Sequence, residues 1–417
     1  MSEPVVEAST AERPAWRHLP RNVWVMTATS FLTDISSNML WDLIPLFLAN
    51  VLGVKANVIG LIEGVAETTA SLLKIFSGWL SDRLRARKWL AVGGYGLSTL
   101  AKPFLYGVTS WWGVLAVRFA DRVGKGIRTA PRDALVAASI DDRHRGLAFG
   151  LHRMGDTLGA ALGILIALLI IHATQAGQLT LSRETFQRVV LASILPAVLA
   201  VIVLAVGARD VPVTGTQAPP RLSLRGFDRR FVVFLAAVVV FTLGNSADAF
   251  LILRAQERGL SVTGVMGMVL TFNLVYAFVS GPAGALSDRI GRYRLIVGGW
   301  LVYGLLYLGF AASTRAWHMW ALYALYGIYY GAVEGNARAL VADLVPEARR
   351  GTAYGVYNAA VGLTALPASL IAGVLWSGIG GWDGFGPRAP FLFGAGLALV
   401  ATAILIGGVR TPGRETT

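Results

Sequence analysis

The chain has 417 residues, of which 55% are hydrophobic and only 15% are charged, so it lacks the charge that a soluble protein needs to cover its surface. We therefore expect a polytopic membrane protein, and we attribute the net charge of +13 to basic loops beside an anionic leaflet rather than to a nucleic-acid surface. The absence of cysteine excludes disulfides and thiolate metal sites.

Apolar runs that are long enough to cross a bilayer recur along the whole chain. A spanning helix needs about 20 mostly apolar residues. On this basis we predict twelve helices, at residues 23–51, 57–80, 89–109, 112–138, 145–173, 187–207, 231–254, 262–285, 293–312, 316–342, 351–377 and 388–409. No signal-type cleavage site separates the polar segment 1–22 from the first run, so we expect that run to be retained as a helix.

The loops between these helices differ in charge. Cations precede the first helix and follow every second helix, and they include Arg13, Arg17, Arg21, Arg83, Arg85, Arg87, Lys88, Arg143, Arg145, Arg221, Arg225, Arg229, Arg230, Arg289, Arg292, Arg294, Arg349 and Arg350. The opposite loops hold fewer cations, such as Lys55, Arg183 and Arg315. The positive-inside rule therefore predicts that both termini and the central loop lie in the cytoplasm.

Two motifs occur twice at nearly the same separation. GWLSDRLRARK at 78–88 matches GALSDRIGRYR at 284–294, and RHRGLAFG at 143–150 matches ARRGTAYG at 348–355. Chance similarity between membrane segments does not explain a shared separation. The repeat predicts two six-helix bundles in the same orientation, at 23–207 and 231–409, with a cytoplasmic tail at 1–22, a central loop at 208–230 and a tail at 410–417.

The predicted helix 112–138 contains an unusually charged stretch, RFADRVGKGIRTAPRD at 118–133. Its charged residues are Arg118, Asp121, Arg122, Lys125, Arg128, Arg132 and Asp133. At 100° per residue they occupy an arc of about 140°, and apolar residues occupy the opposite face. Charges at membrane depth are costly unless they face a cavity or a partner, so we expect this arc to line a pathway or a seam between helices. A network that only holds the helices together remains the alternative.

A polar stripe runs along the first predicted helix. Asp34, Ser37, Asn38, Trp41 and Asp42 follow one another at helical spacing on an otherwise apolar helix. Desolvation favours the neutral form of a carboxyl group, which lets it take up and release a proton near physiological pH. We therefore predict that Asp34 carries a proton and that Asn38 and Trp41 contact a small molecule. Asp42 is expected nearer the external interface, as a solvated end residue.

The second and fifth predicted helices also carry distinctive residues. Glu63 and Glu67, one turn apart near the external end, could share a proton or attract a cation, and a solvated vestibule face is an equal alternative. In the fifth helix three glycines spaced four residues apart predict one smooth face for close helix contact, namely Gly155, Gly159 and Gly163.

The fifth helix further holds a histidine and an aspartate one turn apart. His152 and Asp156 could relay protons, and a buried packing pair with Arg128 or Arg132 is an equal alternative. Arg153 lies beside them and, together with the cations of the fourth helix, outnumbers the nearby carboxylates. We therefore predict that Arg122, Lys125, Arg128, Arg132 and Arg153 contact a small molecule.

The second half of the chain has fewer polar side chains in its helices. Asn245 and Asp248 lie in the seventh predicted helix, and Glu334 lies in the tenth. Because a polar residue in a membrane helix usually faces a cavity or a partner, we add these three to the predicted binding residues.

The number of helices, the six-plus-six repeat and the duplicated G-x-L-S-D-R loop resemble the major facilitator superfamily over essentially the whole chain. This resemblance implies an all-α membrane fold and secondary transport by alternating access, with the site between the halves. The first half also resembles a group of bacterial permeases with a charged fourth helix and no assigned substrate, which implies a multi-pass protein of the bacterial cytoplasmic (inner) membrane. RFADRVG is similar to the R-x-x-Q-G-x-G motif of proton-coupled drug antiporters, with Asp121 in place of Gln and Arg122 in place of Gly. The resemblance implies proton coupling at Arg118 and, by position, a role for Asp133 beside the loop motif. We also predict that Asp121, one turn from Arg118, takes part in proton coupling.

The duplicated loop is also predicted to form a cytoplasmic gate. Gly78 would permit close helix approach, Asp82 would cap a helix or pair with an arginine, and Arg83 and Arg87 would pair with carboxylates of the fourth helix. Asp133 and the repeated set Gly284, Asp288, Arg289 and Arg292 complete the predicted gate. Such a cluster forms in one conformation and breaks in the other.

No phosphate loop, H-E-x-x-H or G-x-S-x-G motif occurs, so we expect neither ATP hydrolysis nor an enzyme, and no cofactor or metal. We predict a monomeric secondary transporter whose partners are a small-molecule substrate, protons and the lipid bilayer, without nucleic acid. Proton-coupled export is the first prediction. Proton-coupled uptake of a small anion is the alternative, because of the excess cations on the fourth helix, and a membrane sensor without transport is the third.

Overall fold

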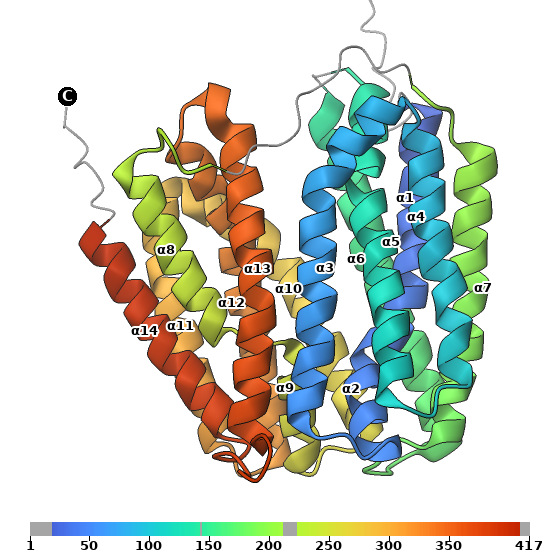
Figure 1. The fold of residues 1–417 in the computed structure, drawn as a ribbon, viewed down its shortest axis with the longest axis vertical. Coiled ribbons are helices and arrows are strands. Elements are labelled where there is room, and N and C mark those ends of the chain that lie inside the picture. Colours follow the sequence, from blue (N-terminus) through green and yellow to red (C-terminus); the bar gives the residue numbers. More distant parts are fainter. Residues whose placement is uncertain (1–18, 142–143, 212–222, 409–417) are drawn as a thin grey trace, which may run out of the picture.

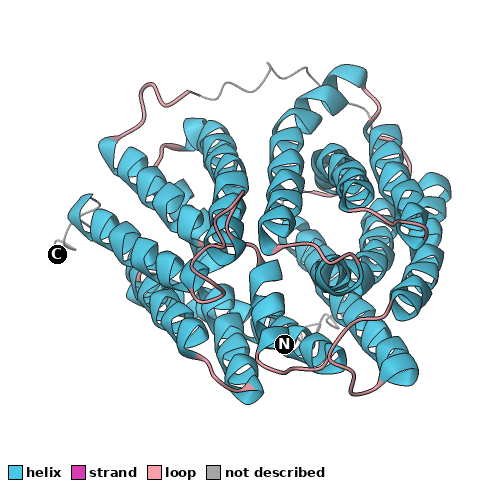
Figure 2. Ribbon diagram, turned by 60° about the horizontal axis from the view of Figure 1, so that its bottom comes forward, coloured by secondary structure: helices cyan, strands magenta, loops and turns pink. Residues whose placement is uncertain are grey.

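The computed structural model describes residues 19–141, 144–211 and 223–408. The predicted tail at 410–417 lies outside these residues, as do most of the tail 1–22 and part of the central loop 208–230. Within the described residues the protein is built from helices and contains no strand (Figure 2). This agrees with the predicted all-α class.

Helices before and after the central loop form two groups (Figure 1). The first half consists of α1 (Arg21–Leu40), η2 (Trp41–Leu43), α2 (Ile44–Leu46), η3 (Phe47–Val51), α3 (Ala56–Leu84), α4 (Arg87–Ala101), η4 (Lys102–Tyr106), α5 (Trp111–Ala138), α6 (Arg145–Gln175) and α7 (Arg183–Gly207). The second half consists of α8 (Arg229–Gly244), α9 (Asp248–Glu257), α10 (Val262–Ile290), α11 (Arg292–Ala312), α12 (Ala316–Asp343), η6 (Glu347–Arg349), α13 (Arg350–Ser377) and α14 (Ala389–Gly408).

Serine caps begin several of these helices. The hydroxyls of Ser110, Ser182 and Ser261 accept hydrogen bonds from backbone N–H groups in the first turns of α5, α7 and α10, at 3.4, 3.2 and 3.1 Å. A capping hydroxyl satisfies one of the backbone donors that a helix start leaves unpaired. These short polar residues between apolar runs therefore define where the helices begin.

Two predicted helices are interrupted, in addition to the run 89–109, which ends in 3₁₀ geometry at Lys102–Tyr106. The run 23–51 changes to 3₁₀ geometry at Trp41–Leu43, and the run 231–254 is broken at 245–247 between α8 and α9. Pro45, which has no backbone N–H to donate, lies just after the first change. At the second break the Tyr303 hydroxyl donates to the Gly244 carbonyl at 3.1 Å and satisfies an acceptor that the broken helix leaves free.

The two halves meet at one end of the molecule and part at the other (Figure 1). We call the end where the described chain begins and ends the terminal end, and the opposite end the far end. At the far end the side chain of Asn57 donates to the Gly378 carbonyl at 2.9 Å, and the Val262 N–H donates to the Gln178 carbonyl at 3.0 Å. These hydrogen bonds tie the first half to the second.

The helices α3 and α13 lie against one another across the seam at the far end. A Cβ atom on Gly60 would lie 2.2 Å from the Ser369 carbonyl oxygen, so only glycine permits this approach. Backbones that pack this closely leave no room for a passage between them. The far end is therefore closed.

Seven helical segments among the described residues are long and apolar enough to cross a membrane, namely Arg145–Gln175, Arg183–Gly207, Arg229–Glu257, Val262–Ile290, Arg292–Ala312, Arg350–Ser377 and Ala389–Gly408. The charged helix α5, at 28 residues, is as long as these segments. Its charges gather toward the protein interior, while Trp112 and Phe119 on its other side are exposed. The apolar surface of such a helix faces outward even though its average hydropathy is low.

The glycine face predicted in the fifth helix packs as expected. A Cβ on Gly159 or Gly163 would lie 2.5 or 2.3 Å from the backbone carbonyl oxygens of Phe31 and Ile35, and Gly155 lies against Thr27. Each contact is to α1, so the predicted close helix contact is confirmed. This contact fixes the position of the polar stripe of α1 along the axis of α6.

Candidate functional site

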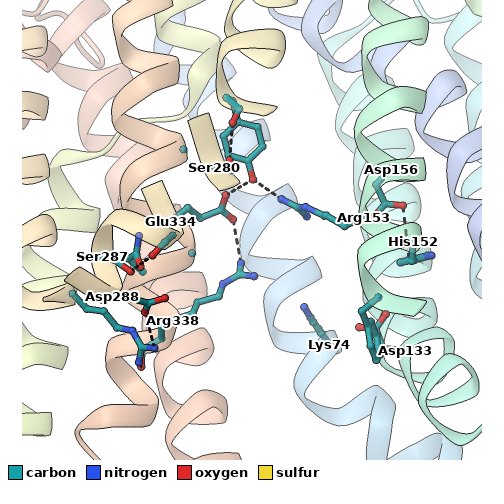
Figure 3. Close-up of a pocket in the computed structure, with 18 of the residues that line it drawn as sticks. Lys74, Asp133, His152, Arg153, Asp156, Ser280, Ser287, Asp288, Glu334 and Arg338 are labelled. Carbon is teal, nitrogen blue, oxygen red and sulfur yellow. Dashed lines mark hydrogen bonds and ion pairs between the residues drawn. The ribbon is translucent and has the colours of Figure 1, made fainter. Parts of the chain in front are cut away.

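Two cavities lie in the seam between the halves. The terminal cavity, of about 690 Å³, lies toward the terminal end (Figure 3), and its ionisable lining residues are Lys74, Arg132, Asp133, His152, Arg153, Asp156, Tyr276, Asp288, Arg292, Glu334 and Arg338. The central cavity, of about 330 Å³, is lined by Trp41, Asp42, Glu63, Glu67, Arg118, Arg122, Asn245, Asp248, Tyr326 and Tyr330 among others. Both halves contribute to each cavity.

Two ion pairs join α3 to α5 beside the central cavity. Arg118 pairs with Glu63, and Arg122 pairs with Glu67 at 3.2 Å. Each helix presents its two partners four residues apart, so both pairs form on facing sides of the helices. The guanidiniums of Arg118 and Arg122 also lie over the Trp41 ring, 4.8 and 6.0 Å from its centre. Arg118, the predicted coupling residue, is thus buried in an ion pair.

Other charges of the predicted arc lie between α5 and α4. Arg128 donates to the Ser98 hydroxyl at 2.9 Å and lies 4.3 Å from the centre of the Tyr95 ring. Asp121 is buried in the same seam, and its backbone carbonyl accepts from Ser98. Neither residue lines the terminal or the central cavity. For Arg128 the structure therefore favours the network that holds helices together over contact with a small molecule.

A group of ionisable side chains connects α1, α5 and α6 near the terminal cavity. His152 lies 3.8 Å from the Asp156 carboxylate and 3.4 Å from the Ser30 hydroxyl. Ser30 also accepts from Arg132 at 3.2 Å. Asp34, one turn beyond Ser30, is half-buried and within electrostatic reach of Asp156. We call Asp34, His152 and Asp156 the acid cluster.

A chain of hydrogen bonds crosses between the halves at the terminal cavity (Figure 3). Arg153 of α6 donates to the Tyr276 hydroxyl of α10 at 2.5 Å, and Tyr276 donates to the Glu334 carboxylate of α12 at 3.0 Å. Arg338 lies 3.3 Å from the same carboxylate. The predicted binding residues Arg153 and Glu334 therefore both line the cavity and are linked through Tyr276.

Removing this link is expected to loosen the seam. Tyr276→Phe removes a hydroxyl whose hydrogen bonds join the halves and stabilise their contact by about 1 kcal/mol. We therefore expect the equilibrium between joined and separated halves to shift several-fold toward the separated state. Because the chain has no cysteine, a single Cys at Ser280 reports accessibility without background, and it should react several-fold faster with a membrane-impermeant maleimide. Tyr293→Phe, whose hydroxyl bonds within the second half, is the control. Equal labelling rates for Ser280→Cys alone, with Tyr276→Phe and with Tyr293→Phe would contradict the expectation.

The predicted gate residues pair within their own halves. Asp82 pairs with Arg87 at 2.7 Å, and Arg83 lies over the Trp79 ring at 5.3 Å, so neither arginine reaches a carboxylate of α5. Asp133 pairs with its neighbour Arg132 at 2.9 Å. In the repeated motif Arg292 pairs with Asp343 at 2.6 Å and with Asp288 at 3.7 Å, while Arg289 is exposed. In the first half Asp82 therefore pairs with an arginine as expected, but Arg83 and Arg87 do not pair with a carboxylate of α5 in this conformation. In the second half Arg292 does pair across helices, with Asp343 of α12.

The gate glycines differ from expectation as well. A Cβ on Gly78 would make ordinary contact with Ala130 at 3.4 Å, and one on Gly284 would meet nothing within 4 Å. The close approach of α3 to α5 lies deeper, where a Cβ on Gly126 would lie 2.5 Å from Leu73. Because crossing helices diverge away from their point of contact, the space at Gly78 is open.

The remaining predicted binding residues divide between the two cavities and the rest of the chain. Trp41, Arg122, Asn245 and Asp248 line the central cavity. Asn38 bonds back to the Asp34 carbonyl at 2.9 Å, and Lys125 is exposed, and both lie outside the two linings.

Several residues at the site were not among the predicted ones. Glu63 and Glu67 were given no single role by the sequence. Their spacing of four residues matches that of Arg118 and Arg122, and it could have indicated two parallel ion pairs between the helices. Asp42 was expected at the external interface, and it lines the central cavity instead. The 3₁₀ turn at Trp41–Leu43 rotates this part of the chain away from the straight helix that the spacing assumed. Tyr276 carries no sequence signal.

The family comparison agrees with this geometry. A model of the Major Facilitator Superfamily matches residues 26–269 and 231–417, which together cover nearly the whole chain. The chain belongs to the major facilitator superfamily. As a major facilitator it is a membrane transporter of a small molecule and not an enzyme, which confirms both predictions.

Relatives and solved structures of major facilitators extend over the same length. An uncharacterized MFS-type transporter of Methanocaldococcus jannaschii is 36% identical over 396 residues, which cover 94% of this chain and 95% of that protein. The crystal structure of a POT family transporter in complex with 5-aminolevulinic acid matches with a TM-score of 0.77 at 13% identity, over 93% of this chain and 96% of that one. A bacterial homolog of the human lysosomal transporter Spinster, inward-facing and occupied, matches with a TM-score of 0.75 at 16% identity, over 94% and 96%. These structures support the fold alone.

Proposed function

We propose that this major facilitator exports a small molecule in exchange for protons, across the bacterial cytoplasmic membrane. In this proposal the chain crosses the membrane twelve times, and the terminal end faces the cytoplasm. The positive-inside rule supports that orientation, because the loops at the terminal end are strongly basic. Their described cations are Arg83, Arg85, Arg87, Lys88, Arg145, Arg209, Arg225, Arg229, Arg230, Arg289, Arg292, Arg294, Arg349 and Arg350.

The observation that carries the proposal is the terminal cavity between the halves. It is lined from both halves, and the far end is closed by backbone packing of α3 against α13. A transporter that works by alternating access requires a site at the interface of its halves that is open to one side at a time. A cytoplasm-facing cavity of about 690 Å³ fits one of these two states.

The acid cluster supports proton coupling. Within the described residues the Asp34 carboxylate has neither a hydrogen-bond donor nor an ion-pair partner. Such a carboxylate is neutral when shielded and ionises when water or a cation reaches it, so its protonation can follow the conformation. His152 and Asp156 line the terminal cavity and provide titratable groups between Asp34 and the cytoplasm.

The ion pairs also bear on the choice between export and anion uptake. The uptake alternative relied on the excess of cations on α5. Arg118 and Arg122 have glutamate partners, and Arg128 packs against Tyr95, so these cations are already neutralised or engaged. Little positive field remains in the central cavity to attract an anion, and we therefore place export first.

Asp34→Asn tests the coupling. A substrate is first identified by ligand-induced thermal shifts in a panel of cations, anions and neutral amphiphiles. In proteoliposomes we then expect the variant to retain counterflow of that substrate. Uptake against a gradient driven by a pH difference should fall by at least tenfold, because asparagine cannot carry the proton. Glu184→Gln, in an exposed ion pair at the far end, is the matched control. Full gradient-driven transport by Asp34→Asn would show that this residue is not the proton carrier.

A further inference from the structure

The central cavity holds more carboxylates than cations. Its ionisable carboxylates and guanidiniums are Asp42, Glu63, Glu67, Asp248, Arg118 and Arg122. Both arginines are taken up by the two glutamates. Asp42 and Asp248 make no hydrogen bond or ion pair with any described residue, although each acts electrostatically on its surroundings. The cavity therefore has two carboxylates without an ion-pair partner among the described residues, although Arg118 and Arg122 lie within electrostatic reach of Asp42.

These two carboxylates come from opposite halves through the two interrupted helices. Asp42 lies on the 3₁₀ turn η2, and Asp248 is the first residue of α9. The helix α2, which follows η2 directly, approaches α9, and the two carboxylates lie within electrostatic reach of one another, so they repel when both are ionised. A positive charge placed between these two residues would relieve the repulsion and would be held by both halves.

An independent feature of the cavity wall points to a ligand as well. Glu63 is only 7% exposed, and while one carboxylate oxygen accepts from Arg118, the other is buried without a donor among the described residues. On the other side of the same pair, Nε and Nη1 of Arg118 are buried without an acceptor. Buried polar atoms of a native protein are normally satisfied, because leaving them bare costs free energy. A ligand with a cationic N–H donor and an oxygen acceptor would satisfy both the free oxygen of Glu63 and the free nitrogens of Arg118.

The size and walls of the cavity restrict the ligand further. A volume of about 330 Å³ is at the lower end of small-molecule sites. The Trp41 ring is already covered by Arg118, whereas Tyr330 is half-buried and lines the cavity beside Tyr326. Aromatic faces attract cations, and the electron-rich wall therefore adds to the two carboxylates.

We propose that the central cavity binds a small organic cation as substrate, held between Asp42 of the first half and Asp248 of the second. This inference rests on the proposed transport function and specifies its substrate class. An organic cation accumulates on the negative side of an energised membrane, so its removal requires a driving force such as proton exchange.

Binding to the purified full-length chain tests the inference without any gradient. The probes share a 4-hydroxyphenyl ring and differ in charge: tyramine, whose ammonium group donates and whose hydroxyl oxygen accepts, the uncharged 4-ethylphenol, and the anion 3-(4-hydroxyphenyl)propanoate. By isothermal titration we expect the cation to bind at least tenfold more tightly than the other two. Asp42→Asn and Asp248→Asn should each weaken its binding about tenfold, and the double variant about a hundredfold, because each removes one attractive charge.

Controls separate charge from folding. Asp248→Glu retains the charge and should bind within a few-fold of the native chain, and Glu184→Gln should bind equally well. Melting temperatures of all variants establish that they are folded. Equal binding of the anion, no preference for the cation, or unchanged binding by the folded double variant overturns the inference.

The outcome also distinguishes the two proposals. If the cation fails to bind while another compound is exchanged for protons in proteoliposomes, the substrate class is wrong and the transport function stands. If the cation binds but is not transported, the site stands and the proposed function fails.

Discussion

Arg118→Met is expected to abolish transport and to destabilise the protein by about 3–5 kcal/mol, because it leaves the Glu63 carboxylate buried without its partner. Arg118 is 2% exposed and Glu63 is 7% exposed, so water cannot replace the lost guanidinium. The measurement is the apparent melting temperature in detergent, together with counterflow in proteoliposomes. The same truncation in an exposed pair, Arg188→Met beside Glu184, should cost no more than about 1 kcal/mol.

A double variant separates the two roles of the pair. Arg118→Met combined with Glu63→Gln removes both buried charges, so stability should return toward that of the native chain. Transport should remain absent if the pair acts in the pathway. Recovery of transport in the double variant would assign Arg118 a purely structural role, and a single variant as stable as the native chain would contradict the burial argument.

Gly163→Ala is expected to destabilise the protein by about 1–3 kcal/mol, since it forces apart two helices that touch through their backbones. The added Cβ would lie 2.3 Å from the Ile35 carbonyl oxygen and 3.0 Å from the Ile35 Cα. These are backbone atoms and cannot move aside as a side chain can. Because Asp34 precedes Ile35 on α1, the displacement should also impair proton-driven transport, which the proteoliposome assay measures.

The same helix provides a matched control. Gly150 is exposed on α6, and a Cβ there would meet nothing within 4 Å. Gly150→Ala should be neutral or stabilising by up to about 1 kcal/mol, because alanine loses less backbone entropy in a helix. Equal melting temperatures for the two variants would contradict the packing argument.

Sequence reasoning succeeded where the signal was local and periodic. The charged stretch 118–133 lies within an uninterrupted helix, and the glycines of α6 form the close contact that their spacing predicted. The class of protein also followed from the duplicated loop motif and the apolar runs. Helical period and apolar length depend only on neighbouring residues, so they can be recognised in one chain.

The interaction partners of the polar residues could not be predicted from the sequence in this way. The spacing placed Arg118, Arg122 and Arg128 on one arc, yet the first two pair with α3 and the third packs against α4. An arc of about 140° is wide enough to face two neighbouring helices. Which neighbour each residue meets depends on how the helices are rotated and shifted against one another.

The sequence by itself determined most of the helices, the duplicated motifs, the family and the charged face of α5, because each of these is encoded over short distances. Only the tertiary structure decided that Asp42 and Asp248 line one cavity, since both lie at interruptions that the apolar pattern does not reveal. It also decided that Glu63 neutralises Arg118 and that Tyr276 links the halves. These contacts join helices far apart in the chain, and their register is set by packing that no local pattern records.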